Sequence, residues 1–196
     1  LASHPAVAQC VVAATPGPDG EPRLVGYVVP RRAAPGTDSS HVARWQAIWD
    51  QTYGSRGDTP APAQDATFDL TGWKNSYTGA PVSAADMRDW LDATVARLLA
   101  LAPRRVLEVG CGTGLLLHRL APHVEHYTAI DFSPAVVGQV RDSVSDRGLR
   151  HVTLHVAPAD RLADHCGPGA VDLVIINSVV QYFPDADYLG RVLEHA

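Results

Sequence analysis

The chain has 196 residues, of which 46% are hydrophobic and 19% charged, so it can bury a substantial core and is not a disordered protein. Its formal net charge of −5 gives no general excess of basic residues for nucleic acid, and no run of about 18 apolar residues is present to span a membrane. The three cysteines lack the even number and the spacing of a disulfide framework or a zinc site, and the first residues lack the basic start of a signal peptide, so we expect a cytoplasmic globular protein without a metal.

Residues 1–32 are expected to form a small unit of their own. The first five residues are typical of the end of a helix, and Val-rich strands are predicted at 8–13 and 24–30. A segment with Pro, Gly and Asp at 16–20 joins them, which predicts a hairpin. The chain starts without Met and ends inside an amphipathic pattern, so we expect a piece of a longer polypeptide.

A linker rich in Pro, Gly and Ser is predicted at 33–40, and a second domain at 41–196. Its first part, residues 41–82, contains an amphipathic helix at 41–53, a loop, and an aromatic-rich segment at 68–81. This part is interpreted as a cap that buries aromatic side chains over the main fold, or as a lid over a ligand. The two interpretations are compatible.

The core of the second domain is predicted at residues 83–196. Ser83 and Asp86 indicate a helix start, and the next apolar run, 106–109, is a short buried strand that ends in the loop Gly110–Gly114. A helix follows from Leu115, so this is a strand, a glycine loop and a helix, with backbone N–H groups directed at the loop.

The spacing of the glycine loop argues against a dinucleotide. A dinucleotide fingerprint needs Gly or Ala at the third position of its Gly-x-Gly-x-x-Gly pattern, and this chain has Leu115 there. Glu108 and Asp131 would place negative charge at both ends of the pocket, which favours a cationic ligand without phosphates. A nicotinamide site and an ordinary strand-to-helix turn are the alternatives.

Three further strands are predicted, at 127–130, 152–156 and 171–176. The first ends at Asp131 and Phe132, and Ser133 as N-cap with Pro134 at the first helical position predicts a helix after it. The almost continuously apolar run at 171–176 is typical of a parallel strand that is covered on both faces. These elements predict an α/β fold with a Rossmann-like parallel sheet.

The pattern Glu-x-Gly-x-Gly-x-Gly at 108–114, followed by Asp131, resembles the class I methyltransferases, which bind S-adenosylmethionine. The resemblance implies that the glycine loop holds the amino acid part of the cofactor, that Asp131 holds the ribose hydroxyls, and that Asp160 faces the adenine amino group. It implies the following cofactor residues: Tyr77, Glu108, Gly110, Cys111, Gly112, Thr113, Gly114, Asp131, Phe132, Ser133, Ala159, Asp160, Asn177 and Ser178. A complete fold of this family has seven strands, whereas only about four are expected in this chain.

Three other stretches resemble nonribosomal peptide synthetases. Leu-x-x-His-Pro-Ala-Val, with Leu-Val-Gly-Tyr-Val-Val after it, is similar to the start of the C-terminal subdomain of their adenylation domains. Phe-x-Leu-x-Gly-Trp-x-x-Ser-Tyr-Thr-Gly-x-Pro and Asn-Ser-Val-Val-Gln-Tyr-Phe-Pro at 177–184 are similar to the methyltransferases embedded in these synthetases. There, Tyr77 would sit near the methionine end of the cofactor.

This order of resemblances implies N-methylation of the α-amino group of an aminoacyl thioester on a carrier protein. The carrier and the rest of the adenylation domain are the implied partners. Asn177, Gln181 and Tyr182 are the candidates for orienting the amine, although none is a strong base. Two other functions are considered: methylation of a side-chain oxygen or sulfur or of a free small molecule, and a cofactor-binding remnant without turnover.

Overall fold

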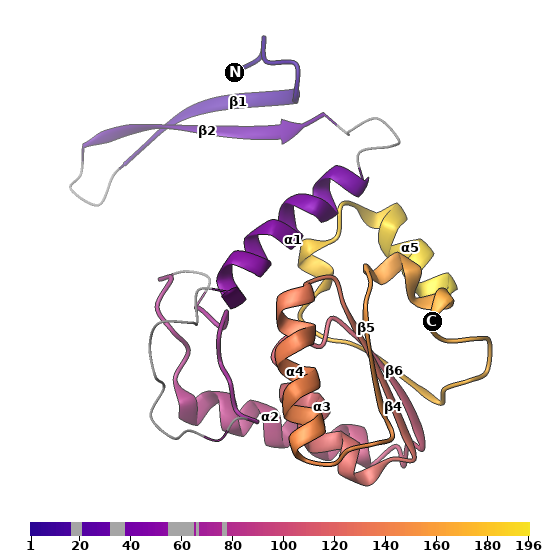
Figure 1. The fold of residues 1–196 in the computed structure, drawn as a ribbon. Helices are drawn as coiled ribbons and strands as arrows, with labels where there is room; N and C mark the ends of the chain where they lie inside the picture. The colour runs from indigo at the N-terminus through magenta and orange to yellow at the C-terminus, as the bar shows by residue number, and fades with distance from the viewer. Residues whose placement is uncertain (17–20, 32–37, 55–64, 66, 76–77) are drawn as a thin grey trace. The chain divides into compact units, whose positions relative to one another are not determined.

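The computed structural model describes residues 1–16, 21–31, 38–54, 65, 67–75 and 78–196. The chain divides into two compact units, Leu1–Ser39 and Ser40–Ala196, which Figure 1 shows as a two-stranded hairpin and an α/β fold. This division falls inside the predicted linker. Each unit is described by itself below.

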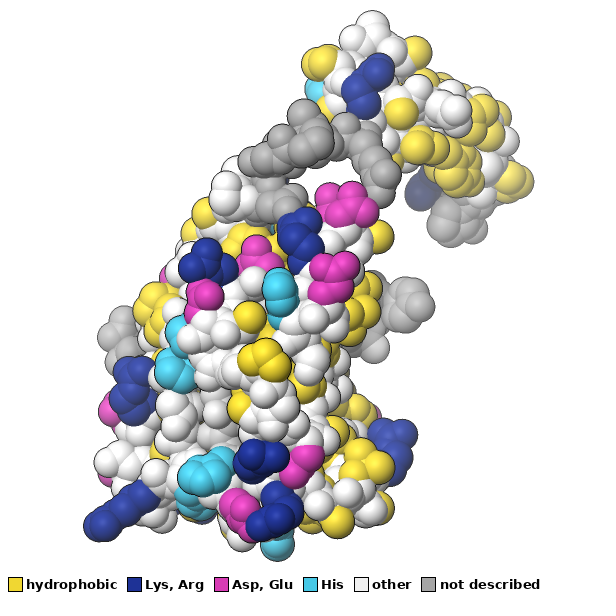
Figure 2. Space-filling model, turned by 90° about the vertical axis from the view of Figure 1, so that its right-hand side faces the viewer, with side chains coloured by type: hydrophobic (Ala, Val, Ile, Leu, Met, Phe, Trp, Pro, Cys, Tyr) yellow, Lys and Arg dark blue, Asp and Glu magenta, His cyan; other side chains and the backbone are white. Residues whose placement is uncertain are grey.

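The first unit is an antiparallel hairpin of β1 (Val7–Pro16) and β2 (Pro22–Pro30), in which Val11 lies opposite Tyr27. Residues 1–6, where the sequence predicts the end of a helix, form turns, with the N–H of His4 bonded to the carbonyl of Leu1 at 3.0 Å. Pro5 lacks the N–H that a helix interior needs. The hairpin exposes large apolar side chains, namely Val11, Val12, Leu24, Tyr27, Val28 and Val29. Figure 2 shows hydrophobic surface gathered on this unit.

The second unit is built around a parallel sheet of β3 (Arg105–Val109), β4 (His126–Asp131), β5 (Val152–Val156) and β6 (Leu173–Ile176). Its strand order is β5-β4-β3-β6, with the first strand of the sheet in a central position. From β3 the sheet continues through β4 to β5 on one side and to β6 on the other, so the strand order reverses at β3. Ligands of open α/β sheets bind at such a point. The predicted Rossmann-like sheet of four strands is therefore confirmed.

Helices cover both faces of this sheet (Figure 1). Residues of α2 (Ala84–Leu99), α3 (Leu115–Leu120) and α4 (Pro134–Asp146) share a core with one face of β3 and β4. On the other face, Leu107 and Val109 pack with residues of η3 (Ala159–Asp164) and α5 (Ala186–Glu194). The alternation of Val106 and Leu107 between the two cores follows from the two-residue period of a strand.

Three further elements of this unit are described. They are α1 (Asp38–Gly54), the short turn η2 (Ala121–His123) and η4 (Val180–Tyr182). Of the helices that the structure describes, none is long and apolar enough to cross a membrane.

Candidate functional site

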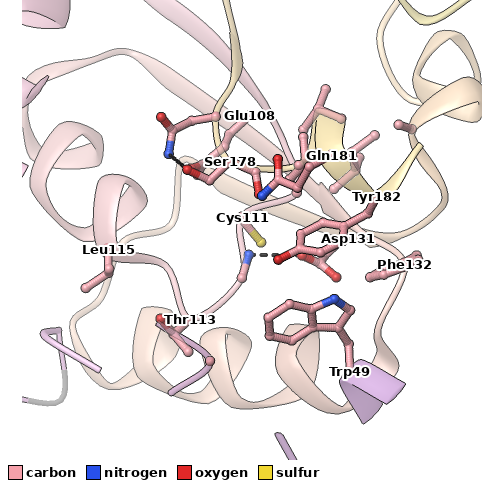
Figure 3. Close-up of a pocket in the computed structure, with 18 of the residues that line it drawn as sticks. Trp49, Glu108, Cys111, Thr113, Leu115, Asp131, Phe132, Ser178, Gln181 and Tyr182 are labelled. Atoms are coloured by element: carbon pink, nitrogen blue, oxygen red, sulfur yellow. Dashed lines mark hydrogen bonds between the residues drawn. The ribbon is translucent and has the colours of Figure 1, made fainter. Parts of the chain in front are cut away.

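A pocket of about 300 Å³ lies at the carboxyl ends of β3, β4 and β6, inside the second unit. The glycine loop forms its base, and residues of α1 and η4 form an aromatic wall. Figure 3 shows Trp49, Asp131 and Tyr182 close together beside Cys111. The predicted residues that line the pocket are Glu108, Gly110, Cys111, Gly112, Thr113, Asp131, Phe132, Ala159, Asn177, Ser178, Gln181 and Tyr182.

The glycines of the loop differ in the groups that lie where a side chain would be. All three have positive φ, which L side chains rarely adopt. A Cβ on Gly110 would lie 2.2 Å from Cγ1 of Val179, so at this position the glycine admits a protein side chain. Among the described residues, a Cβ on Gly112 would meet the hydroxyl of Tyr53, at 3.5 Å, and nothing closer, so Gly112 opens onto the pocket.

Asp131 is a buried carboxylate at the end of β4. Its two oxygens accept hydrogen bonds from the backbone N–H groups of Gly112 at 2.9 Å and Ser133 at 3.0 Å. Burial raises the pKa of Asp131, and these hydrogen bonds oppose that change by stabilising the charged form. The side chain thus fixes the glycine loop against the end of β4 and presents its remaining lone pairs to the pocket.

Glu108 is buried inside β3, where its Oε2 accepts a hydrogen bond of 2.9 Å from the hydroxyl of Tyr127. Burial raises the pKa of Glu108 to about 8, which the Tyr127 hydrogen bond only partly offsets. At neutral pH the side chain is therefore mostly protonated in the ligand-free protein. The expected pair of negative charges therefore needs a correction at neutral pH: there Glu108 becomes an anion when a neighbouring cation lowers its pKa, and without one it ionises above about pH 8.

Helix α1 supplies the aromatic wall. The rings of Trp49 and Tyr53 stack with centroids 5.3 Å apart, and Trp49 meets Tyr182 edge-on at 5.5 Å. Trp45 also packs against Tyr182, with ring centroids 4.8 Å apart. The helix is held in place by hydrogen bonds from Ser133 Oγ to Asp50 Oδ1 and from Gln139 Nε2 to the carbonyl of Tyr53.

The described part of the aromatic-rich segment also lies over the glycine loop. Thr113 Oγ1 donates a hydrogen bond of 2.6 Å to the carbonyl of Asp69, and a Cβ on Gly72 would lie 2.5 Å from the ring of Trp49. Trp73 packs on Trp90 of α2 with ring centroids 5.0 Å apart. The described part of the segment therefore packs half-buried aromatic side chains against the fold and lines the pocket.

At the end of β6 the chain turns sharply into η4. Ser178 has a φ of 55°, in the left-handed region that costs a non-glycine residue free energy. Asn177 Nδ2 donates to Ser178 Oγ at 3.3 Å, and Gln181 Nε2 donates to the carbonyl of Ser178 at 2.8 Å. These bonds hold both amides at the pocket beside Tyr182.

Of the predicted site residues, three lie away from the pocket lining and a fourth is not described. Tyr77 lies outside the described residues. Gly114 caps α3, and Ser133 is fully buried as the N-cap of α4. The Oδ1 of Asp160 accepts a hydrogen bond of 3.0 Å from the hydroxyl of Tyr188, so Asp160 supports η3 next to the pocket wall that Ala159 forms. Gly114, Ser133 and Asp160 do not line the pocket in the part of the chain that the structure describes.

Among the pocket residues that the sequence interpretation did not assign to the site are Trp49, Tyr53 and Lys74. Trp49 was assigned only to the apolar stripe of a helix, and Lys74 is the single lysine of the chain. The repeat of aromatic residues at Trp45, Trp49 and Tyr53, four residues apart on one helix face, is the signal that could have found two of them.

The pocket fits the predicted cofactor. The open space over Gly112 admits a ligand to the main chain, Asp131 offers acceptor sites for hydroxyl groups, and Glu108 can ionise beside a cation. The rings of Trp49 and Tyr182 offer apolar and π surface for the rest of the ligand. No phosphate-binding lysine or arginine lies in the glycine loop itself.

Comparison with known proteins agrees with this geometry. Residues 106–195 match the family described as methyltransferase domain. The chain is 43% identical over 207 residues to chondramide synthase cmdD of Chondromyces crocatus, and 32% identical over 200 residues to the beauvericin nonribosomal cyclodepsipeptide synthetase of Beauveria bassiana. These matches cover 100% and 99% of this chain but only 5% and 6% of the two relatives, so the chain spans a small part of their length.

A solved structure shares the fold. The magnesium protoporphyrin IX methyltransferase of Synechocystis PCC 6803, crystallised with bound S-adenosylmethionine, superposes with a TM-score of 0.53 at 16% identity. The match covers 79% of this chain and 69% of that one.

Proposed function

Since the chain carries a methyltransferase domain and aligns over its length with nonribosomal synthetases, we propose that it methylates the α-amino group of an amino acid held on a carrier protein as a thioester. The fold is one that binds S-adenosylmethionine, as in the Synechocystis enzyme, and we assign this compound to the pocket as methyl donor. The observation that carries the assignment is a buried Asp131 bonded to Gly112, where a ligand can reach the main chain.

In this proposal the pocket residues divide by the part of the cofactor that they hold. Asp131 accepts hydrogen bonds from the ribose hydroxyls, and the loop from Gly110 to Thr113 holds the amino acid part, with Glu108 beside its ammonium group. Phe132 and Ala159 line the adenine side. A carboxyl in an apolar site ionises when a cation is placed next to it, which supports the role of Glu108.

The bound cofactor supplies a methyl group on a sulfonium, whose carbon–sulfur bond breaks as the carbon–nitrogen bond forms and the amine loses a proton. Catalysis then depends mainly on position, because holding the reacting atoms in line can contribute on the order of 7 kcal/mol. Asn177 and Gln181 are amides at the pocket wall whose bonds to Ser178 fix their orientation. Tyr182, held between Trp45 and Trp49, would form the surface on which the amine is placed.

The proposed partners follow from the substrate. An aminoacyl thioester needs a carrier protein, and the amino acid must first be activated by the adenylation domain of the same synthetase. The hairpin of residues 1–32, with its resemblance to the C-terminal adenylation subdomain, supports this context, as do the synthetase relatives. A cytoplasmic location is proposed with it.

The first test is calorimetric binding of S-adenosylmethionine to this chain, with NAD as the comparison ligand. We expect S-adenosylmethionine to bind and NAD not to bind. Asp131→Ala should weaken binding at least tenfold, because it removes the acceptor of the ribose hydroxyls and of the N–H groups of Gly112 and Ser133. Gly112→Val should block binding, since a branched side chain would fill the open space. Unchanged affinity in both variants would refute the site.

The second test determines the acceptor. Carrier proteins loaded with an amino acid are incubated with the chain and S-adenosylmethionine, and the released amino acid is analysed by tandem mass spectrometry. A methyl group on the α-nitrogen is expected. A methyl group on a side-chain oxygen or sulfur, or transfer only to free small molecules, would indicate the alternative methyltransferases. Binding without any transfer would indicate a non-catalytic remnant.

A further inference from the structure

The hydroxyl of Tyr53 is a polar group at the pocket for which the described residues supply no hydrogen-bond partner. The side chain is buried, with 7% of its surface exposed, yet among the described residues no group forms a hydrogen bond with its hydroxyl. Tyr53 lines the pocket, so the hydroxyl faces the space that a ligand would occupy.

Gly112 and Asp131 are the two residues that define the surroundings of this hydroxyl. It lies 3.5 Å from where a Cβ on Gly112 would be, directly over the open glycine of the loop. Asp131, the charged group with the largest influence on its ionisation, is its neighbour. Burial and this carboxylate raise the pKa of Tyr53 far above its usual value, so the group remains a neutral O–H donor at every working pH.

The ring is held so that the hydroxyl cannot easily turn away. It stacks on Trp49, which in turn contacts Gly72 and Tyr182. The carbonyl of Tyr53 accepts a hydrogen bond of 3.2 Å from Gln139 of α4. A donor that is fixed in this way and has no protein acceptor is preorganised for a ligand.

We propose that the hydroxyl of Tyr53 donates a hydrogen bond to a ribose oxygen of the bound cofactor, opposite Asp131. This inference rests on the proposed function, which places the ribose at Asp131. The negative charge of Asp131 disfavours a second carboxylate beside Tyr53, so a neutral oxygen is the better acceptor. Tyr53 and Asp131 then complement each other, one as donor and the other as acceptor, on the same sugar.

The test is calorimetry on three proteins: the wild type, Tyr53→Phe, and Tyr27→Phe as a matched control on the exposed hairpin. The ligands are S-adenosylmethionine and methylthioadenosine, which keeps the ribose and lacks the amino acid part. Tyr53→Phe should weaken both ligands about five- to tenfold, as expected for the loss of one hydrogen bond, and Tyr27→Phe should weaken neither.

Each other outcome overturns the inference. Equal affinity of Tyr53→Phe and the wild type would mean that the hydroxyl makes no contact with the ligand. A loss seen with S-adenosylmethionine alone would place the acceptor on the amino acid part. A Tyr53→Phe protein that no longer folds would mean that the hydroxyl supports the fold instead. If the wild type binds neither ligand, the proposed function itself fails, which separates the two results.

Discussion

At the scale of single residues, the two glycines at the base of the pocket are expected to respond differently to the same change. Gly110→Ala introduces a Cβ 2.2 Å from Val179, at a φ of 75°, so it must displace the chain that follows β6. Gly112→Ala adds only the strain of its φ of 50°, roughly 1–2 kcal/mol. Urea unfolding should show the larger loss of stability for Gly110→Ala. Equal losses would contradict the assigned contact with Val179.

The raised pKa of Glu108 predicts how cofactor binding depends on pH. In the free protein its pKa is about 8, and a bound ammonium group would lower that pKa, so the complex holds fewer protons than the free chain. Binding therefore releases protons, and affinity for S-adenosylmethionine should rise between about pH 6 and 8 and then level off. Calorimetry across this range measures the slope.

Two controls isolate this effect. Glu108→Gln keeps an acceptor for Tyr127 but cannot ionise, so its affinity should be nearly flat over the same range. Methylthioadenosine, which has no ammonium group, should show the same flat profile with the wild type. A slope that persists in Glu108→Gln would assign the proton to another group.

The residues of the glycine loop could be predicted from sequence, because a strand, a loop and a helix that follow one another form one local unit. The protonation of Glu108 could not, since its cause is burial by distant segments. The contacts of Tyr53 with Gly112 likewise join residues about 60 positions apart, and no local pattern encodes them. Asp160 was predicted as a cofactor residue, but its bond to Tyr188 depends on how α5 packs.

At the scale of elements, Ser133 connects three parts of the site. Its hydroxyl accepts from the N–H of Val136 as the N-cap of α4 and donates to Asp50 of α1, while its N–H donates to Asp131. Ser83 caps α2 through Asp86 alone and is exposed. The two serines are thus a matched pair with the same local role and different long-range contacts.

Replacing each serine by Ala should separate the two contributions. Ser83→Ala should cost about 1 kcal/mol, the usual value of a helix cap. Ser133→Ala should cost about 2–4 kcal/mol, because it also leaves Asp50 without this charged hydrogen bond. Chemical denaturation measures both values. Equal costs would show that the bond to Asp50 contributes nothing. The helix starts themselves were predictable, because capping is local, whereas the approach of α1 to β4 was not.

At the scale of the whole molecule, the pocket belongs to one unit. The described residues that line it lie between Val42 and Tyr188, within the unit Ser40–Ala196. The four strands of the parallel sheet could be predicted from the apolar runs, whereas their order could not, because it depends on pairing between strands that are far apart in the sequence. The role of α1 as a pocket wall could not, because its amphipathic pattern fits any apolar surface.

This division predicts the effect of two truncations that differ only in α1. Removing residues 1–37 keeps α1 whole and should leave the affinity for S-adenosylmethionine unchanged, while removing the exposed apolar side chains of the hairpin should reduce aggregation. Removing residues 1–54 also deletes Trp49 and Tyr53, which opens the pocket and exposes the ring of Tyr182. Its affinity should fall by at least tenfold even where circular dichroism shows a folded sheet. Equal binding by both truncated proteins would mean that the sheet and glycine loop hold the cofactor without α1.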